Sequence, residues 1–374
     1  MSYRPISLLS ALSKLFEKTI QSRLLLFSDE NGVLPEEQFG FRKGRSTIHQ
    51  LNRVSNIIQR NRSVSKTTAM ALLDIEKAFD NVWHDGLVYK LHRFNFPIYL
   101  IKIIRSYLSD RAFQVSLHNV CSEQFNINAG VPQGSILGPL LYNIYTSDIP
   151  PLPGGGVLSQ FADDTAIMYK GRVIRALTRS LQGGLDALNE YYTSWKIVIN
   201  AAKTQTIMFP HSRSPRLVPA DDCRIRFGDC LIEWSNEVVY LGLTLDSYLI
   251  FRSHIDKILT KCSVLIRALF PLICKTSKLC LKNQLAVYKQ IIYPALEYAV
   301  PVWKGCAQTH KLRLQRVQNK GLRMILNLPP WTRTVEVHQL ACLDTLEQRF
   351  DIYCLKYGER CSTSVHQIIR DLPQ

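Results

Sequence analysis

One short stretch, Ala69–Ile75 (AMALLDI), constrains the fold more than any other part of the chain. Its apolar residues follow one another without alternation, which is typical of a strand buried on both faces. Asp74 stands near the end of this run, where a carboxylate must be paired, hydrogen-bonded or bound to a metal. The pattern therefore predicts an interior strand with a charged end.

The other patterns place strands in the middle of the chain and helices on both sides. Apolar residues recur about every 3.6 positions over Ser7–Phe27, Ser46–Arg60, Val173–Trp195 and from about Phe251 onward, which predicts helices. Strands are expected at Ala112–Leu117, Gln124–Asn128, Val157–Phe161, Thr165–Tyr169, Thr204–Phe209, Ile225–Trp234 and Val238–Leu245. Strands grouped between helical segments predict an α+β core with flanking helical lobes.

Positive charge is the second strong feature. The formal net charge is +16, and residues 250–330 alone carry 14 Lys or Arg against two acids. A chain this basic usually binds a polyanion, either nucleic acid or a membrane surface, although solvated helix faces would explain part of the excess. No stretch of the length of a bilayer span is apolar without charge, so no membrane span is expected.

The cysteines and the first residues bear on the cellular compartment. The chain has 10 cysteines, but no C-x-x-C pair and no cysteine–histidine set at zinc-finger spacing. The N-terminus lacks a basic segment followed by an apolar run, so no secretory signal is expected. We therefore expect reduced thiols in an intracellular protein.

Asp163 and Asp164 form a second unusual acidic site. They lie between Val157–Phe161 and Thr165–Tyr169, two short apolar segments that predict a hairpin. Taken separately, each site has a simpler explanation: Asp74 would cap a neighbouring element, and Asp163 and Asp164 would be ordinary turn residues. Together, three carboxylates on neighbouring strands suit Mg²⁺, and two such ions about 4 Å apart promote phosphoryl transfer. In a basic chain this chemistry points to a nucleic-acid polymerase or a nuclease.

Seven segments of the chain resemble motifs of reverse transcriptases. Motifs A, B and C are matched by 73–80 (LDIEKAFD), 130–135 (GVPQGS) and 161–164 (FADD). Four further matches are 3–8 (YRPISL), 38–42 (QFGFR), 203–204 (KT) and 240–242 (YLG). The segments 82–84 (VWH) and 141–146 (LYNIYT) are similar to non-LTR retrotransposons (LINEs), jockey-like in particular. Seven motifs in one order make chance similarity very improbable.

This resemblance implies a right-hand polymerase with fingers, a palm with an antiparallel sheet, and a helical thumb. It assigns residues 1–68 to N-terminally truncated fingers and 69–245 to the palm with some fingers elements. Residues 246–345 would form the basic thumb and 346–374 a C-terminal extension. No endonuclease domain or CCHC zinc knuckle is recognisable, so we expect the polymerase portion of a larger element protein.

The resemblance also implies the catalytic set. Asp74, Asp163 and Asp164 would hold two Mg²⁺ ions, with Mn²⁺ as an alternative, whereas Asp80 stays outside the metal set as a turn or helix-start acid. Lys203 would protonate the leaving pyrophosphate, with an ordinary exposed lysine as the alternative.

Further residues are expected to bind the nucleotide. Phe79 would lie under the sugar and leave no room for a 2′-hydroxyl, unless it is simply a core phenylalanine. Gln133 and Gly134, in a turn before a helix, would order the nucleotide and the template. Arg42 and Arg45 belong to a basic loop whose residues would bind the triphosphate, with a solvated loop face as the alternative.

The last set of expected contacts involves the nucleic-acid strands. Tyr240, Leu241 and Gly242 would form the primer grip. The thumb would follow duplex phosphates in a sequence-independent, salt-sensitive way, with some of its cations contacting only solvent. Its candidate contacts are Lys257, Lys261, Lys311, Arg316 and Lys320.

The expected function is RNA-directed DNA polymerisation in retrotransposition. The expected partners are an RNA template, a DNA primer, dNTPs and the endonuclease domain of the parent protein, in the nucleus and cytoplasm and without a membrane. A viral RNA-dependent RNA polymerase shares the palm carboxylates, but Phe79 and Ala162 argue against it, because such enzymes favour G-D-D and admit the 2′-hydroxyl. A decayed or domesticated fragment would bind RNA or DNA without catalysis, and the intact acids argue against that alternative.

Overall fold

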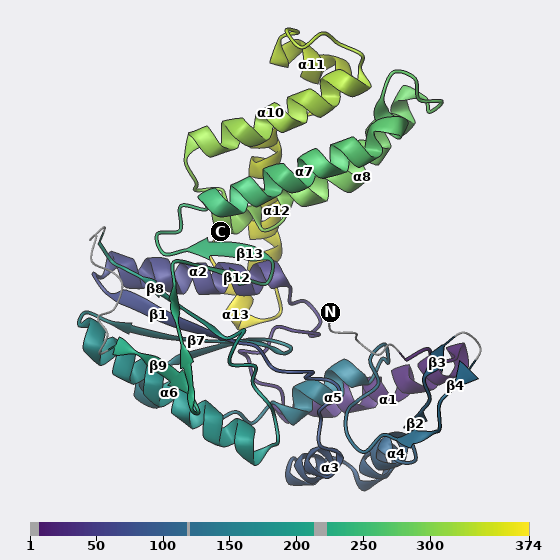
Figure 1. Ribbon diagram of the computed structural model, residues 1–374, viewed down its shortest axis with the longest axis vertical. Coiled ribbons are helices and arrows are strands. Elements are labelled where there is room, and N and C mark those ends of the chain that lie inside the picture. Colours follow the sequence, from purple (N-terminus) through teal and green to yellow (C-terminus); the bar gives the residue numbers. More distant parts are fainter. Residues whose placement is uncertain (1–6, 118–119, 213–222, 374) are drawn as a thin grey trace. The chain divides into compact units, whose positions relative to one another are not determined.

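The computed structural model describes residues 7–117, 120–212 and 223–373, so residues 3–6 of the first motif lie outside the described part. Contacts divide the chain into two compact units, coloured along the sequence in Figure 1. Unit 1 comprises Met1–Gln50 and Asn61–Ser235, and unit 2 comprises Leu51–Arg60 and Asn236–Gln374. Helix α2 (Thr47–Ser63) therefore contributes residues to both units.

Unit 1 is built around a five-stranded sheet with the order β11-β8-β1-β7-β6. The central strand is β1 (Thr67–Leu73), and every one of its residues is buried, which confirms the predicted interior strand. It pairs antiparallel with β7 (Asp164–Gly171) and β8 (Gln205–Phe209). The edges are β6 (Val157–Phe161), which is antiparallel, and β11 (Trp234–Ser235), which is parallel to its neighbour.

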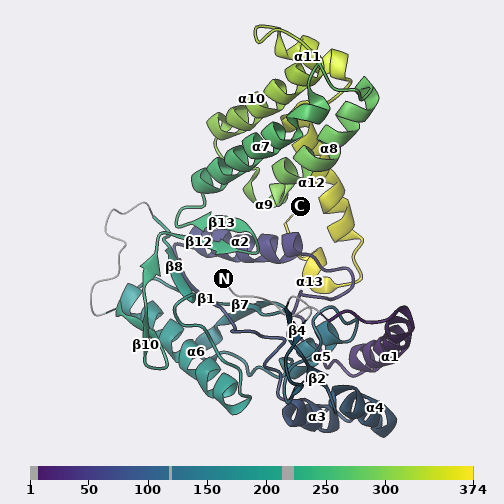
Figure 2. The ribbon, with the colours of Figure 1, turned by 45° about the vertical axis from the view of Figure 1, so that its right-hand side comes forward.

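Helices pack around this sheet and complete an α+β fold. Helix α6 (Ile174–Ser194) lies along one face of the sheet and contacts β1 and β7 (Figure 1). Helices α3 (His84–Arg93), α4 (Ile98–Leu108) and α5 (Gly138–Tyr145) group together beyond the ends of the strands in both Figure 1 and Figure 2. The predicted α+β class is confirmed.

Small hairpins and a short helical turn complete unit 1. Their strands are shorter than the patterns predicted, because only a few residues of each segment pair. The elements are β2 (Ala112–Phe113) with β5 (Phe125–Asn126), β3 (Ser116–Leu117) with β4 (Val120–Cys121), β9 (Ile225–Phe227) with β10 (Cys230–Ile232), and the 3-10 turn η1 (Pro153–Gly155).

The first helix, α1 (Ala11–Glu30), departs from its predicted pattern. It begins after Ser10, whose hydroxyl accepts a hydrogen bond from the backbone N–H of Ser13 at 3.1 Å. Ile20 is buried, but Leu12 is 80% exposed, so the apolar residues do not form one buried stripe. The carboxylate of Glu17 lies on the buried side of α1, where it accepts a hydrogen bond from the backbone N–H of Ile136 in unit 1.

Unit 2 begins with a hairpin and continues as helices, which confirms the helical pattern expected in the basic segment. Its core includes the buried Trp303, whose ring packs edge-on against Phe350 at 5.3 Å. Its elements are β12 (Glu237–Tyr240), β13 (Leu243–Asp246), α7 (Arg252–Ile273), α8 (Leu281–Glu297), α9 (Val300–Trp303), α10 (Gln308–Ile325), α11 (Thr334–Ala341), α12 (Leu346–Ser362) and α13 (Gln367–Arg370). The hairpin β12–β13 groups with these helices, whereas the palm was predicted to extend to residue 245.

Two simple properties of the chain complete the description. All 10 cysteines are free thiols, as expected. In the part of the chain that the structure describes, every helix is too short or too polar to cross a bilayer.

Candidate active site

The three predicted metal ligands come from one end of the central strands of unit 1. Leu73, the last residue of β1, pairs with Thr165 of β7. Asp74 directly follows Leu73, and Asp164 directly precedes Thr165, so the two acids adjoin the last pair of these strands at the same end. Asp163 precedes Asp164 in the turn between β6 and β7. The backbone therefore gathers the three acidic positions at one edge.

The side chains themselves do not form a ready-made metal centre. Among the described residues, no three His, Cys, Asp or Glu side chains are grouped so as to hold an ion. The donor set still fits Mg²⁺, because carboxylate oxygens at half-exposed and exposed positions are ligands that this ion prefers. Joint ion binding by Asp74, Asp163 and Asp164 thus stays a prediction that requires their side chains to converge.

A segment before α2 holds the acidic turn in place. The side-chain oxygen of Gln38 accepts hydrogen bonds from the backbone N–H groups of Gly40 and Ala162, each at 2.8 Å. Ala162 has a left-handed backbone (φ 56°), an uncommon conformation for this residue that such contacts stabilise. A Cβ on Gly40 would lie 2.1 Å from the backbone nitrogen of Ala162. The matched segment 38–42 therefore serves as a support for the turn, a role that the sequence analysis missed.

Lys203 lies beside the first of the three predicted metal ligands, Asp74, and its role as a proton donor stays a prediction. Its ammonium nitrogen is 3.7 Å from a carboxylate oxygen of Asp74. The backbone N–H of Asn200 donates to the carbonyl of Asp74 at 2.8 Å, and the N–H of Lys203 donates to the carbonyl of Asn200 at 3.1 Å. These bonds tie the segment before β8 to the end of β1, so Lys203 is positioned by backbone geometry.

Phe79 packs in an aromatic cluster near the acidic turn. Its ring is 5.0 Å from that of Tyr142 and 6.1 Å from that of Phe41, and Phe79 itself is half-buried. Tyr142 is fully buried, and burial, together with the negative charges of Asp163 and other neighbours, raises its pKa well above the ordinary value. Phe79 is thus neither a fully buried core residue nor remote from the acids.

The predicted nucleotide-ordering turn docks on motif A. The backbone N–H of Val131 donates to the carbonyl of Phe79 at 2.7 Å, and the amide of Gln133 donates to the carboxylate of Asp80 at 2.8 Å. Asp80 therefore orients Gln133, and its exclusion from the metal set stays a prediction. Gly134 is exposed and has φ 99°, a backbone conformation that favours glycine.

A buried carboxylate that the sequence analysis missed supports the same turn. Glu17 is only 1% exposed and accepts hydrogen bonds from the backbone N–H groups of Ile136 and Leu137 at 2.7 and 3.2 Å. These two N–H groups lie directly before α5, at the helix end where the helix dipole stabilises a negative charge. An acid inside the apolar pattern of α1 was the available signal.

The two arginines expected to bind the triphosphate have other partners in the structure. The Arg45 side chain is fully buried, forms an ion pair with Glu36 and donates to the carbonyl of Gln38 at 3.2 Å. Arg42 is nearly buried and donates to the carbonyl of Pro35 at 2.7 Å. Both guanidinium groups hold their own loop together, so the structure gives no support to their assignment as nucleotide ligands.

In unit 2, the predicted primer grip forms the turn of the hairpin β12–β13. Tyr240 is buried, whereas Leu241 and Gly242 have left-handed backbones (φ 46° and 78°). The hydroxyl of Tyr298 donates to the carbonyl of Leu241 and fixes the turn from the helical side of the unit. The structure therefore gives the segment a rigid shape, and its contact with a primer stays a prediction.

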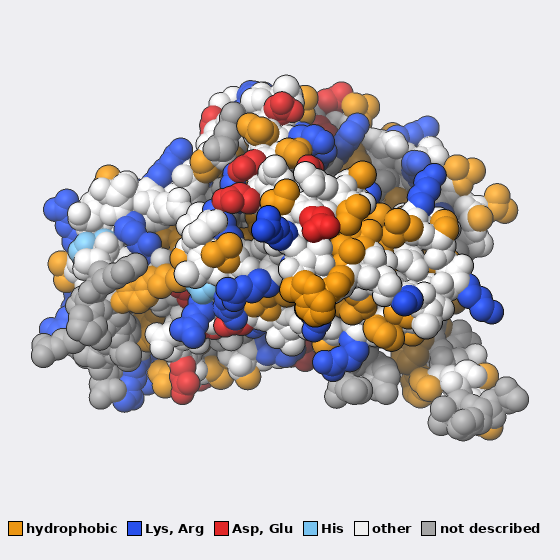
Figure 3. Space-filling view, turned by 90° about the horizontal axis from the view of Figure 1, so that it is seen from above, with side chains coloured by type: hydrophobic (Ala, Val, Ile, Leu, Met, Phe, Trp, Pro, Cys, Tyr) orange, Lys and Arg blue, Asp and Glu red, His pale blue; other side chains and the backbone are white. Residues whose placement is uncertain are grey.

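The predicted thumb cations differ in how they are used. Lys261, Arg316 and Lys320 are exposed, whereas Lys257 donates to the hydroxyl of Thr244 at 2.9 Å. Lys311 is half-buried and lines a cavity of about 470 Å³. Seen from above, Lys and Arg side chains are dispersed among apolar ones without forming one continuous patch (Figure 3). Which of these cations contact nucleic acid stays a prediction.

The mainly antiparallel sheet, with acids on the β6–β7 turn and at the adjacent end of β1, places the chain in the α+β class. Comparison with known families makes the class specific. Residues 1–245 match the family described as reverse transcriptase (RNA-dependent DNA polymerase), and the chain belongs to this family.

Curated relatives from Drosophila melanogaster confirm the resemblance to non-LTR retrotransposons. The chain is 35% identical to the "Probable RNA-directed DNA polymerase from transposon X-element" and 35% identical to the "RNA-directed DNA polymerase from mobile element jockey". The alignments cover 96% and 99% of this chain but 39% and 40% of those proteins, so the chain spans about two fifths of their length. Among solved structures, apo telomerase from Candida tropicalis aligns with 62% of this chain and 43% of its own, at 14% identity and a TM-score of 0.42.

Proposed function

We propose that this chain catalyses RNA-directed DNA polymerisation as part of a retrotransposon protein. It would add deoxynucleotides to a primer 3′-hydroxyl opposite an RNA template and release pyrophosphate. The observation that supports this proposal most strongly is the last pair of β1 and β7, Leu73 with Thr165, because Asp74 and Asp164 adjoin it and Asp163 lies in the neighbouring turn.

The chemistry follows from the residues at the strand ends. Asp74, Asp163 and Asp164 would hold two Mg²⁺ ions, or Mn²⁺, and bound ions would stabilise the attacking and leaving oxygens. Lys203 is held near Asp74 and would give a proton to the leaving pyrophosphate. Positioning and charge neutralisation then supply most of the catalysis, and no protein nucleophile is required.

Selection of the nucleotide would depend on the aromatic cluster and the docked turn. The half-buried ring of Phe79, supported by Tyr142, offers a flat surface under the sugar and would exclude a 2′-hydroxyl. Gln133, oriented by Asp80, and the exposed backbone of Gly134 would order the nucleotide against the template. The hairpin turn Tyr240–Gly242 would present the primer end.

The partners and the location follow from the same proposal. An RNA template, a DNA primer and dNTPs are the required ligands, and the endonuclease domain of a longer parent protein is a further partner. The relatives exceed this chain by more than half of their length, which supports a multidomain parent. Action as a ribonucleoprotein in the nucleus and cytoplasm is part of the proposal.

The decisive experiment is extension of an annealed DNA primer on an RNA template with Mg²⁺. Wild-type chain should extend with dNTPs and much less with rNTPs. Asp163→Asn removes one proposed ion ligand and should reduce extension by at least about a hundredfold, the scale of lost electrostatic stabilisation in an active site. Binding of the template–primer should remain.

Asp229→Asn is the matched control, because this exposed acid also lies in a hairpin turn, but its strands β9 and β10 pair only with each other and not with the sheet that carries the acidic set. It should extend primers like wild type. Equal extension by wild type and Asp163→Asn would refute the catalytic assignment.

A further inference from the structure

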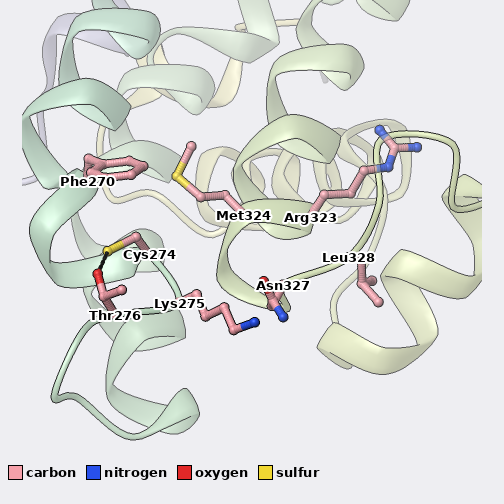
Figure 4. A pocket seen from close by; sticks show the side chains of 8 residues that line it. All are labelled: Phe270, Cys274, Lys275, Thr276, Arg323, Met324, Asn327 and Leu328. Atoms are coloured by element: carbon pink, nitrogen blue, oxygen red, sulfur yellow. Dashed lines mark hydrogen bonds between the residues drawn. The ribbon is translucent and has the colours of Figure 1, made fainter.

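A cavity of about 270 Å³ lies in unit 2 between the ends of two long helices. Figure 4 shows Phe270, near the end of α7, facing Met324, near the end of α10, while Lys275 and Asn327 converge from below. No function discussed so far uses this cavity. Its walls combine apolar and polar groups in a way that defines a particular ligand chemistry.

One wall is apolar and open. Phe270 is 51% exposed, and Met324 lies beside it, while Leu328 lines the cavity on the side of Asn327 (Figure 4). A half-exposed aromatic ring beside a thioether is a costly surface in water and a good stacking surface for a flat apolar ligand. A planar ligand is therefore favoured on this side.

The opposite side of the cavity is polar and carries donor and acceptor groups that form no hydrogen bond within the described residues. Within the described residues, neither the ammonium of Lys275 nor the amide of Asn327 has a hydrogen-bond or ion-pair partner. Cys274 and Thr276, in contrast, bond to each other at 3.1 Å, and Arg323 donates to the carbonyl of Thr332 at 2.7 Å. The ligand would thus meet one amide, which offers a donor and an acceptor, and one cation.

The backbone turn that carries Asn327 is fixed before any ligand binds. Helix α10 ends at Ile325, and Asn327 has a left-handed backbone (φ 53°), as is common just after a helix. The N–H of Leu328 donates to the carbonyl of Arg323 at 2.8 Å, which fixes the turn. A fixed backbone at this position reduces the conformational entropy that binding would cost.

The geometry points to a pocket for one unpaired nucleobase of a bound RNA or DNA strand, stacked on Phe270 and hydrogen-bonded by Asn327. Lys275 would pair with the adjacent phosphate. Unpaired bases are recognised in this manner, by stacking on aromatic rings together with hydrogen bonds to the base edge. The lining residues that the structure describes include no acid that would repel a phosphate. This inference rests on the proposed function for the presence of a strand.

A nucleobase suits the cavity better than an apolar peptide segment does. Its faces are apolar and its edge carries donors and acceptors, which matches a ring on one wall and a free amide on the other. Every unpaired base carries a donor beside an acceptor, and adenine combines such an edge, at N6–H and N7, with the larger stacking face of a purine. We therefore expect a preference for adenine that depends on Asn327.

The test measures binding of the full chain to labelled 20-nucleotide RNA strands and to a blunt-ended duplex. Phe270→Ala should weaken binding of an unpaired A-rich strand by about tenfold, the scale of one lost stacking contact, and leave duplex binding unchanged. Phe270→Trp should retain strand binding because it keeps a stacking face. Asn327→Ala should reduce the preference of wild type for A-rich over U-rich strands.

Matched controls come from nearby residues outside the cavity. Trp331→Ala removes an aromatic ring that is 83% exposed, and Lys278→Ala removes an exposed lysine three positions after Lys275. Both should bind like wild type, whereas Lys275→Ala should weaken binding and reduce its salt dependence. Circular dichroism of each variant would verify folding.

Three results would overturn the inference. If Phe270→Ala binds the strand as tightly as wild type does, a nucleobase is excluded as the ligand of the cavity, and a peptide segment becomes the candidate. An equal loss for duplex and unpaired strand would show a general defect. If AMP competes as strongly as RNA does, the ligand of the cavity is a free nucleotide and not a base of a bound strand.

Primer extension measured on the same samples separates this inference from the proposed function. If the proposed polymerase activity is wrong, wild type fails to extend while the effect of Phe270→Ala on strand binding persists. If the pocket is wrong, extension persists while that effect is absent.

Discussion

At the scale of single residues, the sequence showed which side chains are cationic but not whether each one stabilises the fold or binds a ligand. Arg45 was expected to bind a triphosphate but is buried against Glu36. Lys90, which drew no attention in the sequence, is fully buried, bonded to Asp148 and stacked 3.7 Å over the ring of Trp195. Burial and partners, which depend on distant segments, decided whether each cation stabilises the fold or remains available to a ligand.

Phe79 provides a test of nucleotide selection at this scale. Phe79→Ala removes the ring under the proposed sugar site and should raise rNTP incorporation relative to dNTP by at least about tenfold, because a steric clash rather than a hydrogen bond is lost. The measurement compares extension rates with each nucleotide type. Phe113→Ala, which removes a half-exposed ring from a hairpin, is the control and should leave the ratio unchanged. An unaltered ratio in Phe79→Ala would remove the steric explanation.

Lys90 provides a test of pH dependence. Burial lowers the pKa of Lys90 to about 8 from 10.5, so the folded state binds its proton less strongly than the unfolded state does. Its contribution to stability is therefore greatest above the unfolded pKa and is lost as the pH falls toward 8. Relative to Lys90→Met, the free energy of unfolding of wild type should rise by a few kcal/mol between pH 8 and 10.

Chemical denaturation at several pH values measures this difference. Lys102→Met, which changes an exposed lysine of α4, should show the pH dependence of wild type. If Lys90→Met also follows the wild-type curve, the lysine titrates normally in the folded state.

At the scale of elements, the matched motifs act by holding one another. Segment 38–40 supports the turn at Ala162, the segment at Asn200 binds the end of β1, and the turn at Val131 docks on Phe79. These contacts join parts of the chain that are far apart in sequence. Motif matching identified the segments, and the tertiary structure showed that several support the site without contacting substrate.

Gly40→Ala tests this support. The new Cβ would lie 2.1 Å from the backbone nitrogen of Ala162, so the acidic turn must move. Such overpacking should cost about 1–3 kcal/mol of stability, and extension should fall by at least about tenfold. Gly183→Ala, in α6 with open space around its Cβ position, should match or slightly exceed wild-type stability. Wild-type extension by Gly40→Ala would show that the turn tolerates the shift.

At the scale of the whole molecule, the charge balance is the dominant property. The net charge of +16 and the basic segment of unit 2 favour a polyanionic partner independently of any site. Exposed cations such as Lys261, Arg316 and Lys320 are available for phosphates, while Arg313 is paired with Asp256 at 2.5 Å. Affinity for nucleic acid should therefore be broad in sequence and sensitive to salt.

Removal of these exposed cations tests the electrostatic part of binding. Each substitution among Lys261→Ala, Arg316→Ala and Lys320→Ala that removes a phosphate contact should reduce the slope of log affinity against log salt by about 1, equally for different sequences. Fluorescence anisotropy over a salt series measures the slope. Lys356→Ala, on an exposed side of α12, is the control. If the variant with all three substitutions keeps the wild-type slope, these cations do not contact nucleic acid, which then binds at another surface.

The sequence by itself determined an interior strand, predicted at Ala69–Ile75 and found at Thr67–Leu73, together with the hairpin that carries Asp163, the helical basic segment and the family, because these depend on local periodicity and on short motifs. Only the tertiary structure decided which polar side chains are free. Arg45 was assigned to a ligand and Glu17 was overlooked because partners such as Glu36 and the N–H of Ile136 cannot be found from local pattern. Burial and hydrogen bonding between distant segments exist only once the chain has folded.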